Sequence, residues 1–413
     1  MRRLGGGRSG EVSLNRFFRN DAVTVEEIFA TAGAHVADRC SGCDHVLVLQ
    51  DTTVVRGNKQ GGLFLHVGVA LDAQSDALLG VVHGEFVERV AGRNINKRHV
   101  TTVDKESQRW LTVAAKAGEL CSDAQRITVI ADRESDIFEA LVRRPANVHL
   151  LIRAARDRAL EDGTRVFAQL DAQPELARRT LDLPAGGGRK ARQAELALRL
   201  AHVRVRKPRN GKQAKDLPQV MDINLVDVRE VNVPAGQTPL HWRLLCTQEV
   251  TTIEQGWDVA ALYRRRWHIE QVFRSFKSEG FDIEKLRLQD EAPLEKVAAA
   301  CFIATVIAQQ LVHARDGTPP GKLQRPMLDA FQPDDIPLIE AFCKDLEGKT
   351  KRQKNPHPRG SLAYAAWVCA RLGGWTGYYG KPGPIVMLRG WRHLNAAKLG
   401  WTLASHIAEV GNV

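Results

Sequence analysis

The feature of this sequence that most constrains its fold is the order of apolar segments between residues 45 and 153. Three strand-like runs come first. A helical segment, a strand, a second helical segment and a last strand then follow in turn. Strands and helices that alternate in this way predict an α/β domain. The segments cover residues 45–55, 63–72, 77–86, 106–121, 126–132, 136–144 and 149–153.

Two aspartates stand at the ends of central strands in this order. Asp51 comes in the first apolar run, and Asp132 ends the strand that follows the first helix. Open α/β sheets carry their chemistry at the carboxyl ends of strands, so we expect both carboxylates there. The order of elements is that of a ribonuclease H-like core, which we therefore predict. Structural roles remain open: an Asx turn at Asp51, and a helix cap at Asp132 or Asp136.

A third carboxylate lies in the segment YRRRWHIEQVFRSFK, which spans residues 263–277. Four of its side chains recur at spacings of 3, 4 and 7 residues. At about 100° per helical residue they share an arc of about 60°. A carboxylate on this face can ligate a hard cation, while its basic groups can neutralise phosphate oxygens. The alternative is a surface helix with an ion pair four residues apart. The four residues are Tyr263, Arg266, Glu270 and Lys277.

Three carboxylates, two on strands and one on a later helix, form the pattern needed to hold two divalent cations at a phosphodiester. One cation would lower the pKa of an attacking water or hydroxyl, and the other would stabilise the leaving 3′ oxygen. Mg²⁺ suits such a site because it accepts a few carboxylates together with water and phosphate oxygens; Mn²⁺ could substitute. The ligands would be Asp51, Asp132 and Glu270.

The composition is that of an ordinary globular chain with a basic surplus. The 413 residues carry a formal net charge of +11, which makes polyanions such as DNA plausible partners. Seven thinly spread cysteines indicate a reducing cytoplasm. No run approaches the roughly 18 apolar residues of a membrane helix, and the start of the chain has no apolar core of a secretory signal. We expect a cytoplasmic protein, associated with the nucleoid and not with a membrane.

Two further regions are expected outside the core. Residues 154–250 contain strand-like pieces separated by turns such as PAGGGRK, with no helix of useful length, which we interpret as a β-rich insertion. From about residue 251 the chain is helical. The last region, 316–413, is expected to be a small helical element that contains Tyr364, Trp367, Trp375 and Trp391.

Three motifs resemble those of the DDE transposases of bacterial insertion sequences, in the group named for insertion sequence four. They are QDTT at 50–53, ADRESDI at 131–137 and the Tyr–Arg–Glu–Lys segment at 263–277. The resemblance implies that the three carboxylates form the catalytic, metal-binding triad. It also implies two kinds of DNA contact, to phosphates and to a base extruded in a hairpin intermediate. The phosphate contacts would be Tyr263, Arg266, Lys277 and Arg153, and the stacking residue would be Trp242.

The activity that the resemblance implies is cut-and-paste DNA transposition. The enzyme would hydrolyse double-stranded DNA at transposon ends and then join the freed 3′-hydroxyl to target DNA. It would act as a homodimer on two paired ends, with dimer contacts in the C-terminal element. Without the resemblance, Trp242 in an alternating strand is more simply a core residue. Trp267 and Phe273 are expected to be packing residues.

The N-terminal part is shorter than the family pattern implies. Relatives carry a sizeable helical DNA-binding region before the first aspartate, and 50 residues precede Asp51 here. One other function therefore stays open, a truncated non-catalytic regulator that dimerises with full-length transposase and inhibits it. A ribonuclease H-like nuclease without strand transfer is a separate alternative, against which the arrangement of Trp242 and Tyr263 argues. The expected divisions are a disordered tail at 1–12, a remnant of the DNA-binding region at 13–44 with a helix over Val23–Asp38, and a core at 45–153 and 251–315.

Overall fold

A nine-stranded mixed sheet runs through the protein in the order β3-β2-β1-β4-β5-β9-β8-β7-β6. The computed structural model describes residues 8–58, 61–90, 108–183, 191–209, 216–278, 280–286, 288 and 290–410. The α/β class and the order of elements between residues 45 and 153 are confirmed. These elements are β1 (His45–Asn58), β2 (Gly61–Asp72), β3 (Leu78–Val90), α3 (Gln108–Leu120), β4 (Arg126–Ala131), α4 (Phe138–Arg143) and β5 (Val148–Arg153).

Strand β1 is longer than expected and continues past Asp51 to Asn58. Its parallel pairing with β4 ends at the pair formed by Gln50 and Ala131. Its antiparallel pairing with β2 continues to the last residue of the strand, so β2 supplies the hydrogen bonds that sustain the extension. Asp51 therefore lies inside a strand, where β4 ends beside it. The expectation that Asp51 sits at the end of its strand, or in an Asx turn there, is wrong.

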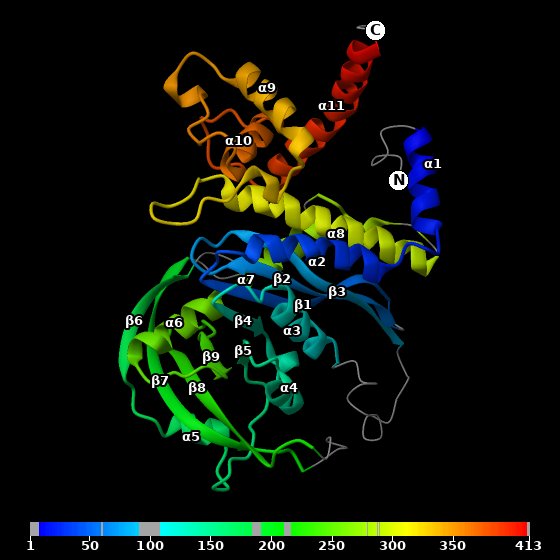
Figure 1. Cartoon of the computed structure of the whole chain (residues 1–413). Helices are drawn as coiled ribbons and strands as arrows, with labels where there is room; N and C mark the ends of the chain where they lie inside the picture. The colour runs from blue at the N-terminus through cyan, green and yellow to red at the C-terminus, as the bar shows by residue number, and fades with distance from the viewer. Residues whose placement is uncertain are drawn as a thin grey trace.

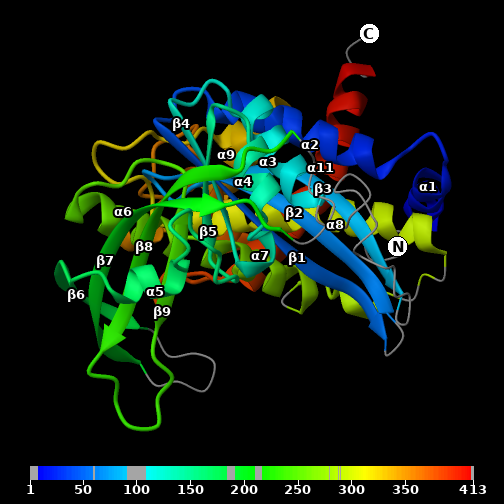
Figure 2. The same cartoon turned by 90° about the horizontal axis from the view of Figure 1, so that it is seen from below.

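The β-rich segment after β5 extends the same sheet. β9 pairs antiparallel with β5, and β8, β7 and β6 follow it outward. Figure 2 shows that β7 and β8 run in a different direction from β1 and β2, so the sheet is strongly twisted. One helix of six residues, α5, lies within this segment, in keeping with the expectation of no helix of useful length. The elements are α5 (Val166–Asp171), β6 (Ala177–Leu183), β7 (Arg192–Arg206), β8 (Val220–Val231) and β9 (His241–Cys246).

Two hydrophobic layers lie on the two faces of the sheet, and Figure 1 shows helices covering it. Along β1, Leu47 and Leu49 enter one layer while Val46 and Val48 enter the other, as the two-residue period of a strand requires. Full burial of such a side chain contributes about 1.5–3 kcal/mol. Helices α3, α4 and α5 cover the second layer. The first is covered by α6 (Ile253–Arg264), α7 (Trp267–Lys277) and α8 (Glu291–Ala314).

The N-terminal helices correct one expectation and confirm another. α1 (Arg8–Arg19) begins inside the stretch expected to be disordered, so that expectation is wrong for residues 8–12; residues 1–7 lie outside the described part. α1 buries Phe18 in the first layer, where an apolar side chain is stabilised by leaving water. α2 (Val25–Cys40) confirms the expected helix, and Thr24 caps it by accepting the Glu27 amide.

The C-terminal helices share a hydrophobic core with the end of α8. Tyr364 and Trp367 are buried in it, whereas Trp375 and Trp391 pack against it partly exposed. Figure 1 shows α8 between the sheet and these helices, with α11 extending away. By length and composition α8 could cross a membrane, but 67% of its most apolar window is buried inside the protein, as in a core helix. The helices are α9 (Ile336–Leu346), α10 (Leu362–Leu372) and α11 (Pro384–Val410).

Candidate active site

Asp51 and Asp132 stand side by side on neighbouring strands. Gln50 and Ala131 form the last pair between β1 and β4, and neighbouring strands lie about 5 Å apart. The side chains two residues before the aspartates belong to the first hydrophobic layer, so alternation places both carboxylates on that face. Asp132 precedes a short 3₁₀ helix but makes no side-chain cap hydrogen bond with it. The cap interpretation of Asp132 is therefore wrong.

The segment 263–277 is the junction of two helices, where the sequence predicts one. α6 ends at Arg264 and α7 begins at Trp267. Between them, the amides of Arg265 and Arg266 donate to carbonyls three residues back, which makes a tighter turn than an α-helix. α6 packs on β7 and β8, whereas α7 packs on β1 and α8. Because the sheet twists between these strands, a single straight helix could not follow both.

Arg266 joins a strand carboxylate to the helix carboxylate. Its Nη1 lies 3.1 Å from Asp51 Oδ2, and its Nη2 lies 2.5 Å from Glu270 Oε1. The Arg266 side chain is only 13% exposed, so these charge-assisted hydrogen bonds are made largely away from water. Tyr263 donates from its hydroxyl to Asp132 Oδ1 at 3.3 Å. The structure thus gathers three of the four segment residues and both aspartates, which excludes the simple surface pair.

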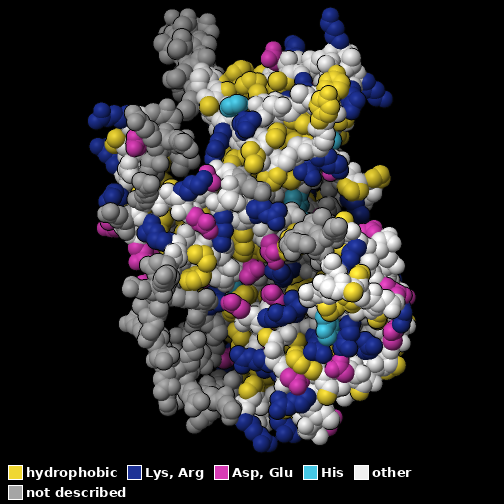
Figure 3. All heavy atoms as spheres, turned by 180° about the vertical axis from the view of Figure 1, so that it is seen from behind, with side chains coloured by type: hydrophobic (Ala, Val, Ile, Leu, Met, Phe, Trp, Pro, Cys, Tyr) yellow, Lys and Arg dark blue, Asp and Glu magenta, His cyan; other side chains and the backbone are white. Residues whose placement is uncertain are grey.

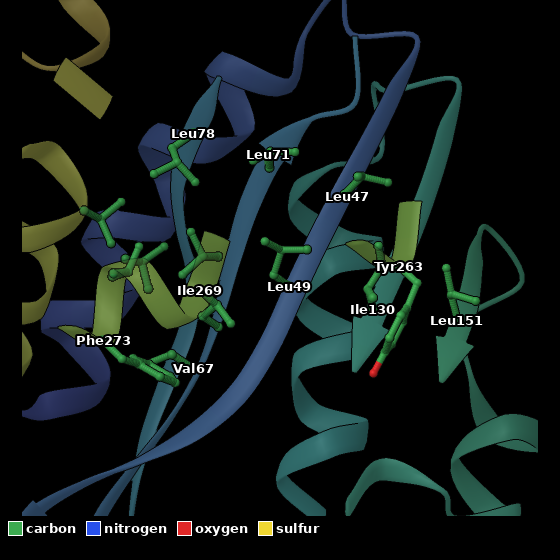
Figure 4. Close-up of a cluster of buried hydrophobic side chains, with 14 of the residues drawn as sticks. Leu47, Leu49, Val67, Leu71, Leu78, Ile130, Leu151, Tyr263, Ile269 and Phe273 are labelled. Carbon is green, nitrogen blue, oxygen red and sulfur yellow. The ribbon is translucent and has the colours of Figure 1, made fainter. Parts of the chain in front are cut away.

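Tyr263 is anchored by the hydrophobic layer that ends at this site. Figure 4 shows its ring in the same cluster as Ile130 and Leu151, with the hydroxyl at the tip of the side chain. Burial, followed by the negative charge of Asp132, raises the pKa of Tyr263 to about 12. The phenol therefore stays protonated at neutral pH and remains a hydrogen-bond donor to Asp132.

Burial has the largest effect on the pKa of Asp51. Burial raises the pKa of Asp51 to about 6, and the charges of Asp132 and Glu270 contribute in the same direction. The Thr52 amide, which donates to Asp51 Oδ1 at 2.7 Å, and the Arg266 guanidinium both oppose this rise. A further cation beside Asp51 would favour its ionised form.

The three carboxylates suit a hard divalent cation in their chemistry. Carboxylate oxygens are the ligands that Mg²⁺ and Mn²⁺ prefer. Among the described residues, however, no group of three His, Cys, Asp or Glu side chains is close enough to hold an ion as it stands. Arg266 contacts both Asp51 and Glu270 and supplies the positive charge there. An ion shared by those two carboxylates would require the guanidinium to move.

Lys277 lies at the opposite end of α7 from this cluster. Its Nζ is 3.8 Å from Glu284 Oε1, and 11 helical residues, or about 16 Å along the axis, separate the two ends of the helix. Of the four residues expected on one face, Tyr263, Arg266 and Glu270 therefore meet at the site. Lys277 lies further along α7 and does not contact the three carboxylates.

The aromatic side chains near the site differ from expectation in one case. Trp242 packs edge-on against Tyr263, with ring centroids 5.6 Å apart at 66°, and is partly buried in the first layer. Phe273 is 9% exposed and is a packing residue as expected. Trp267 is 51% exposed at the start of α7, so the expectation that it is a packing residue is wrong.

Asp136 has a role that the sequence did not reveal. It was expected at most to cap a helix, but its Oδ2 accepts the amides of Ala155 and Arg156, each at 2.9 Å. Its Oδ1 accepts Arg158 Nε at 2.9 Å, and the two side chains are 0% and 4% exposed. Asp136 therefore fixes the loop after β5. Arg153 ends β5 just before this loop and donates from Nη2 to the His241 carbonyl at 3.0 Å.

Comparison with known families points to one activity. Residues 106–307 match the family model described as a transposase DDE domain. The match covers a little under half of the chain. It includes Asp132, Glu270 and the junction of α6 with α7, and it begins after Asp51. It supports assignment to a DDE transposase family.

Proposed function

We propose that this chain is a DDE transposase of the group named for insertion sequence four, near the transposase of transposon five. The match to the transposase DDE domain supports transposase activity on DNA. The observation that carries the proposal is that Asp51 and Glu270 share the guanidinium of Arg266, while Asp132 follows the neighbouring strand and accepts from Tyr263 of the same segment.

A ribonuclease H-like core is the fold that this proposal entails. Its support is the part of the sheet ordered β3-β2-β1-β4-β5. In this part three antiparallel strands are followed by two strands parallel to β1. The arrangement brings the first and fourth strands together; Asp51 lies in the first, and Asp132 directly follows the fourth.

Asp51, Asp132 and Glu270 would hold two divalent ions, Mg²⁺ or Mn²⁺. Bound ions supply an activated water or hydroxyl and stabilise the leaving 3′ oxygen. The protein itself would hold the three carboxylates close together. Arg266 neutralises part of their negative charge by contacting Asp51 and Glu270. Asp51, with a pKa near 6, is mostly ionised above pH 7 and available as a ligand. Tyr263 orients Asp132 through its hydroxyl.

Arg266 would exchange its carboxylate partners for a DNA phosphate. A guanidinium binds carboxylate and phosphate oxygens with similar forked geometry, so an incoming phosphodiester competes with Asp51 and Glu270. The exchange would free both carboxylates for metal. Lys277 and Arg153 would contact phosphates further along the strand, in keeping with their places at the end of α7 and the end of β5.

An aromatic surface for an extruded base would complete the hairpin pathway. Trp242 is the expected residue, and its contact with Tyr263 places it beside the site. Trp267 offers a more open indole face, next to Arg266 in sequence. A base stacked on either ring would gain about 1–3 kcal/mol.

The wider assembly follows from the same proposal. The enzyme would act on double-stranded transposon ends and target DNA, as a homodimer with contacts in the C-terminal element at 316–413. Residues 13–44 would belong to an end-recognition region. It would work in the bacterial cytoplasm, on the nucleoid.

The test is a Mg²⁺-dependent cleavage assay on a pre-nicked duplex that carries the element's own terminal repeat. The native chain should release the end, and the Asp132→Ala variant, matched for folding by its unfolding midpoint, should not. Equal absence of cleavage from both, with dimers present in solution, would refute the proposal in favour of the non-catalytic regulator.

A further inference from the structure

A basic hollow lies beyond the carboxyl ends of β4 and β5, beside the catalytic aspartates. Its volume is about 350 Å³, at the lower end of the range for sites that enclose small ligands. Three arginines, a histidine and a phenylalanine line it, and none of the described residues that line it is a carboxylate. We call this site the basic hollow. Its lining residues are Arg133, Arg153, Ala154, Ala155, Phe167, His241 and Arg243.

The floor of the basic hollow is fixed by buried hydrogen bonds. Ala154 and Ala155 follow β5, and the Asp136 carboxylate accepts the Ala155 amide while it pairs with Arg158. Both of these charged side chains are almost completely buried, so the loop cannot shift without exposing or separating them. Because the two floor residues are alanines, the space above them stays open.

The wall of the basic hollow is a preorganised guanidinium. Arg243 lies over the Phe167 ring, with 4.2 Å between Cζ and the ring centroid, and its Nη2 pairs with Asp171 at 3.3 Å. Its Nε is buried and lies 3.9 Å from Asp227 Oδ1, so a second carboxylate holds the guanidinium in place. His241 is held by Asp227, at 2.6 Å from Nε2 to Oδ1.

The basic hollow carries more positive charge than its acidic neighbours neutralise. Asp171 and Asp227 offset Arg243. Arg133 is exposed and forms no ion pair in the described part of the chain, and the Arg153 guanidinium donates to a neutral carbonyl. Fixed guanidinium groups with surplus charge select a phosphodiester, which they can bind in a bidentate manner.

We infer that the basic hollow binds one sugar-phosphate unit of a DNA strand that leads away from the bond being cut. Arg133 follows Asp132 directly in the chain, so a strand at the carboxylates would pass the hollow within a nucleotide or two. Arg133 and Arg243 are its new phosphate contacts, on either side of Arg153. The inference rests on the proposed transposase function, because it takes the carboxylates as the point of cleavage.

Binding of DNA without divalent metal tests the inference apart from catalysis. Fluorescence anisotropy would compare the native chain with Arg133→Ala and Arg243→Gln on a terminal-repeat duplex and on an unrelated duplex. The control is Arg178→Ala, which removes a 47% exposed arginine from β6, outside the lining of the hollow. Each hollow variant should weaken binding about five- to tenfold at 0.1 M salt and reduce the salt slope by about 0.9, whereas the control should not.

The two duplexes identify the source of the strand. Loss on the terminal-repeat duplex alone assigns the basic hollow to the transposon end, and loss on both assigns it to any DNA backbone, target DNA included. Native-like binding by exposed Arg133→Ala, whose folding the change should not disturb, would overturn the inference. If native protein cleaves the pre-nicked duplex and both variants bind normally, only the hollow fails. If the variants lose binding while native protein never cleaves, the proposed function fails and the basic hollow is left as a DNA-backbone site without a bond being cut beside it.

Discussion

Replacing Asp51 by asparagine should stabilise the protein while abolishing its activity. The pKa of Asp51 in the folded chain is about 6, against an ordinary value of 3.8. The difference, about 6 minus 3.8, corresponds to about 3 kcal/mol that the ionised carboxylate costs the folded state. Asparagine has nearly the same shape and carries no charge. The side chain of Asp51 is only 26% exposed, so solvent screening removes little of this cost from the free energy of unfolding.

The pH dependence gives the prediction its sign. A carboxyl group with a raised folded pKa binds more protons in the folded state than in the unfolded state between pH 3.8 and about 6. The stability contributed by protonated Asp51 is therefore present at low pH and lost as the pH rises through about 6. The free-energy difference between Asp51→Asn and the native chain should be near zero at pH 4 and reach about 3 kcal/mol above pH 7.

Urea unfolding followed by tryptophan fluorescence measures this difference. Histidines that titrate in the same pH range contribute equally to the free energy of unfolding of both proteins, so their contribution cancels in the difference. Asp123→Asn, at an exposed position, is the matched control and should show no such trend. An Asp51→Asn protein that is less stable than native at pH 7.5, or a difference that does not grow between pH 4 and 7, would refute the reasoning.

Three further changes test individual side chains. Glu270→Gln should abolish cleavage and leave DNA binding intact, because it removes a metal ligand; cleavage and filter binding on one duplex check this, and retained cleavage would exclude Glu270. Trp267→Ala should impair hairpin formation more than first nicking, and more than Trp242→Ala does, because its indole is more exposed; product analysis on gels that shows the reverse order would favour Trp242. Lys277→Ala should reduce the salt slope of DNA binding by about 0.9, and an unchanged slope would remove Lys277 from the phosphate contacts.

The sequence predicted the parts of the fold that depend on local pattern. The strands and helices between residues 45 and 153 follow from apolar periodicity, and Thr24 marks the start of α2 by its capping hydroxyl. The end of β1 could not be predicted in this way. It depends on hydrogen bonds from β2 that continue after β4 has ended, a property of the assembled sheet.

The candidate site was predictable in its residues but not in its geometry. Spacing alone brought Tyr263, Arg266 and Glu270 together correctly. It assumed one helix, however, and the chain bends after Arg264 because α6 and α7 follow different parts of a twisted sheet. The hydrogen bond from Arg266 to Asp51 joins residues 215 positions apart in the chain, so the spacing of residues along a helix could not predict it.

Roles set by burial were the least predictable from sequence. Trp267 is a large apolar residue, a type that usually packs inside a protein. Its exposure depends on where the bend places the first turn of α7. Asp136 lies in a motif with two other acidic residues. Its function as the anchor of the loop after β5 depends on Arg158, 22 residues away. Local pattern contains no signal for that pairing.

The most direct test of the account is a crystal structure of the chain with Mn²⁺ and a transposon-end duplex, examined by anomalous scattering of the metal. The account predicts anomalous peaks within coordination distance of Asp51, Asp132 and Glu270, with the Arg266 guanidinium moved from the carboxylates to a DNA phosphate. Metal peaks elsewhere, or DNA bound with Arg266 still joining Asp51 to Glu270, would contradict it.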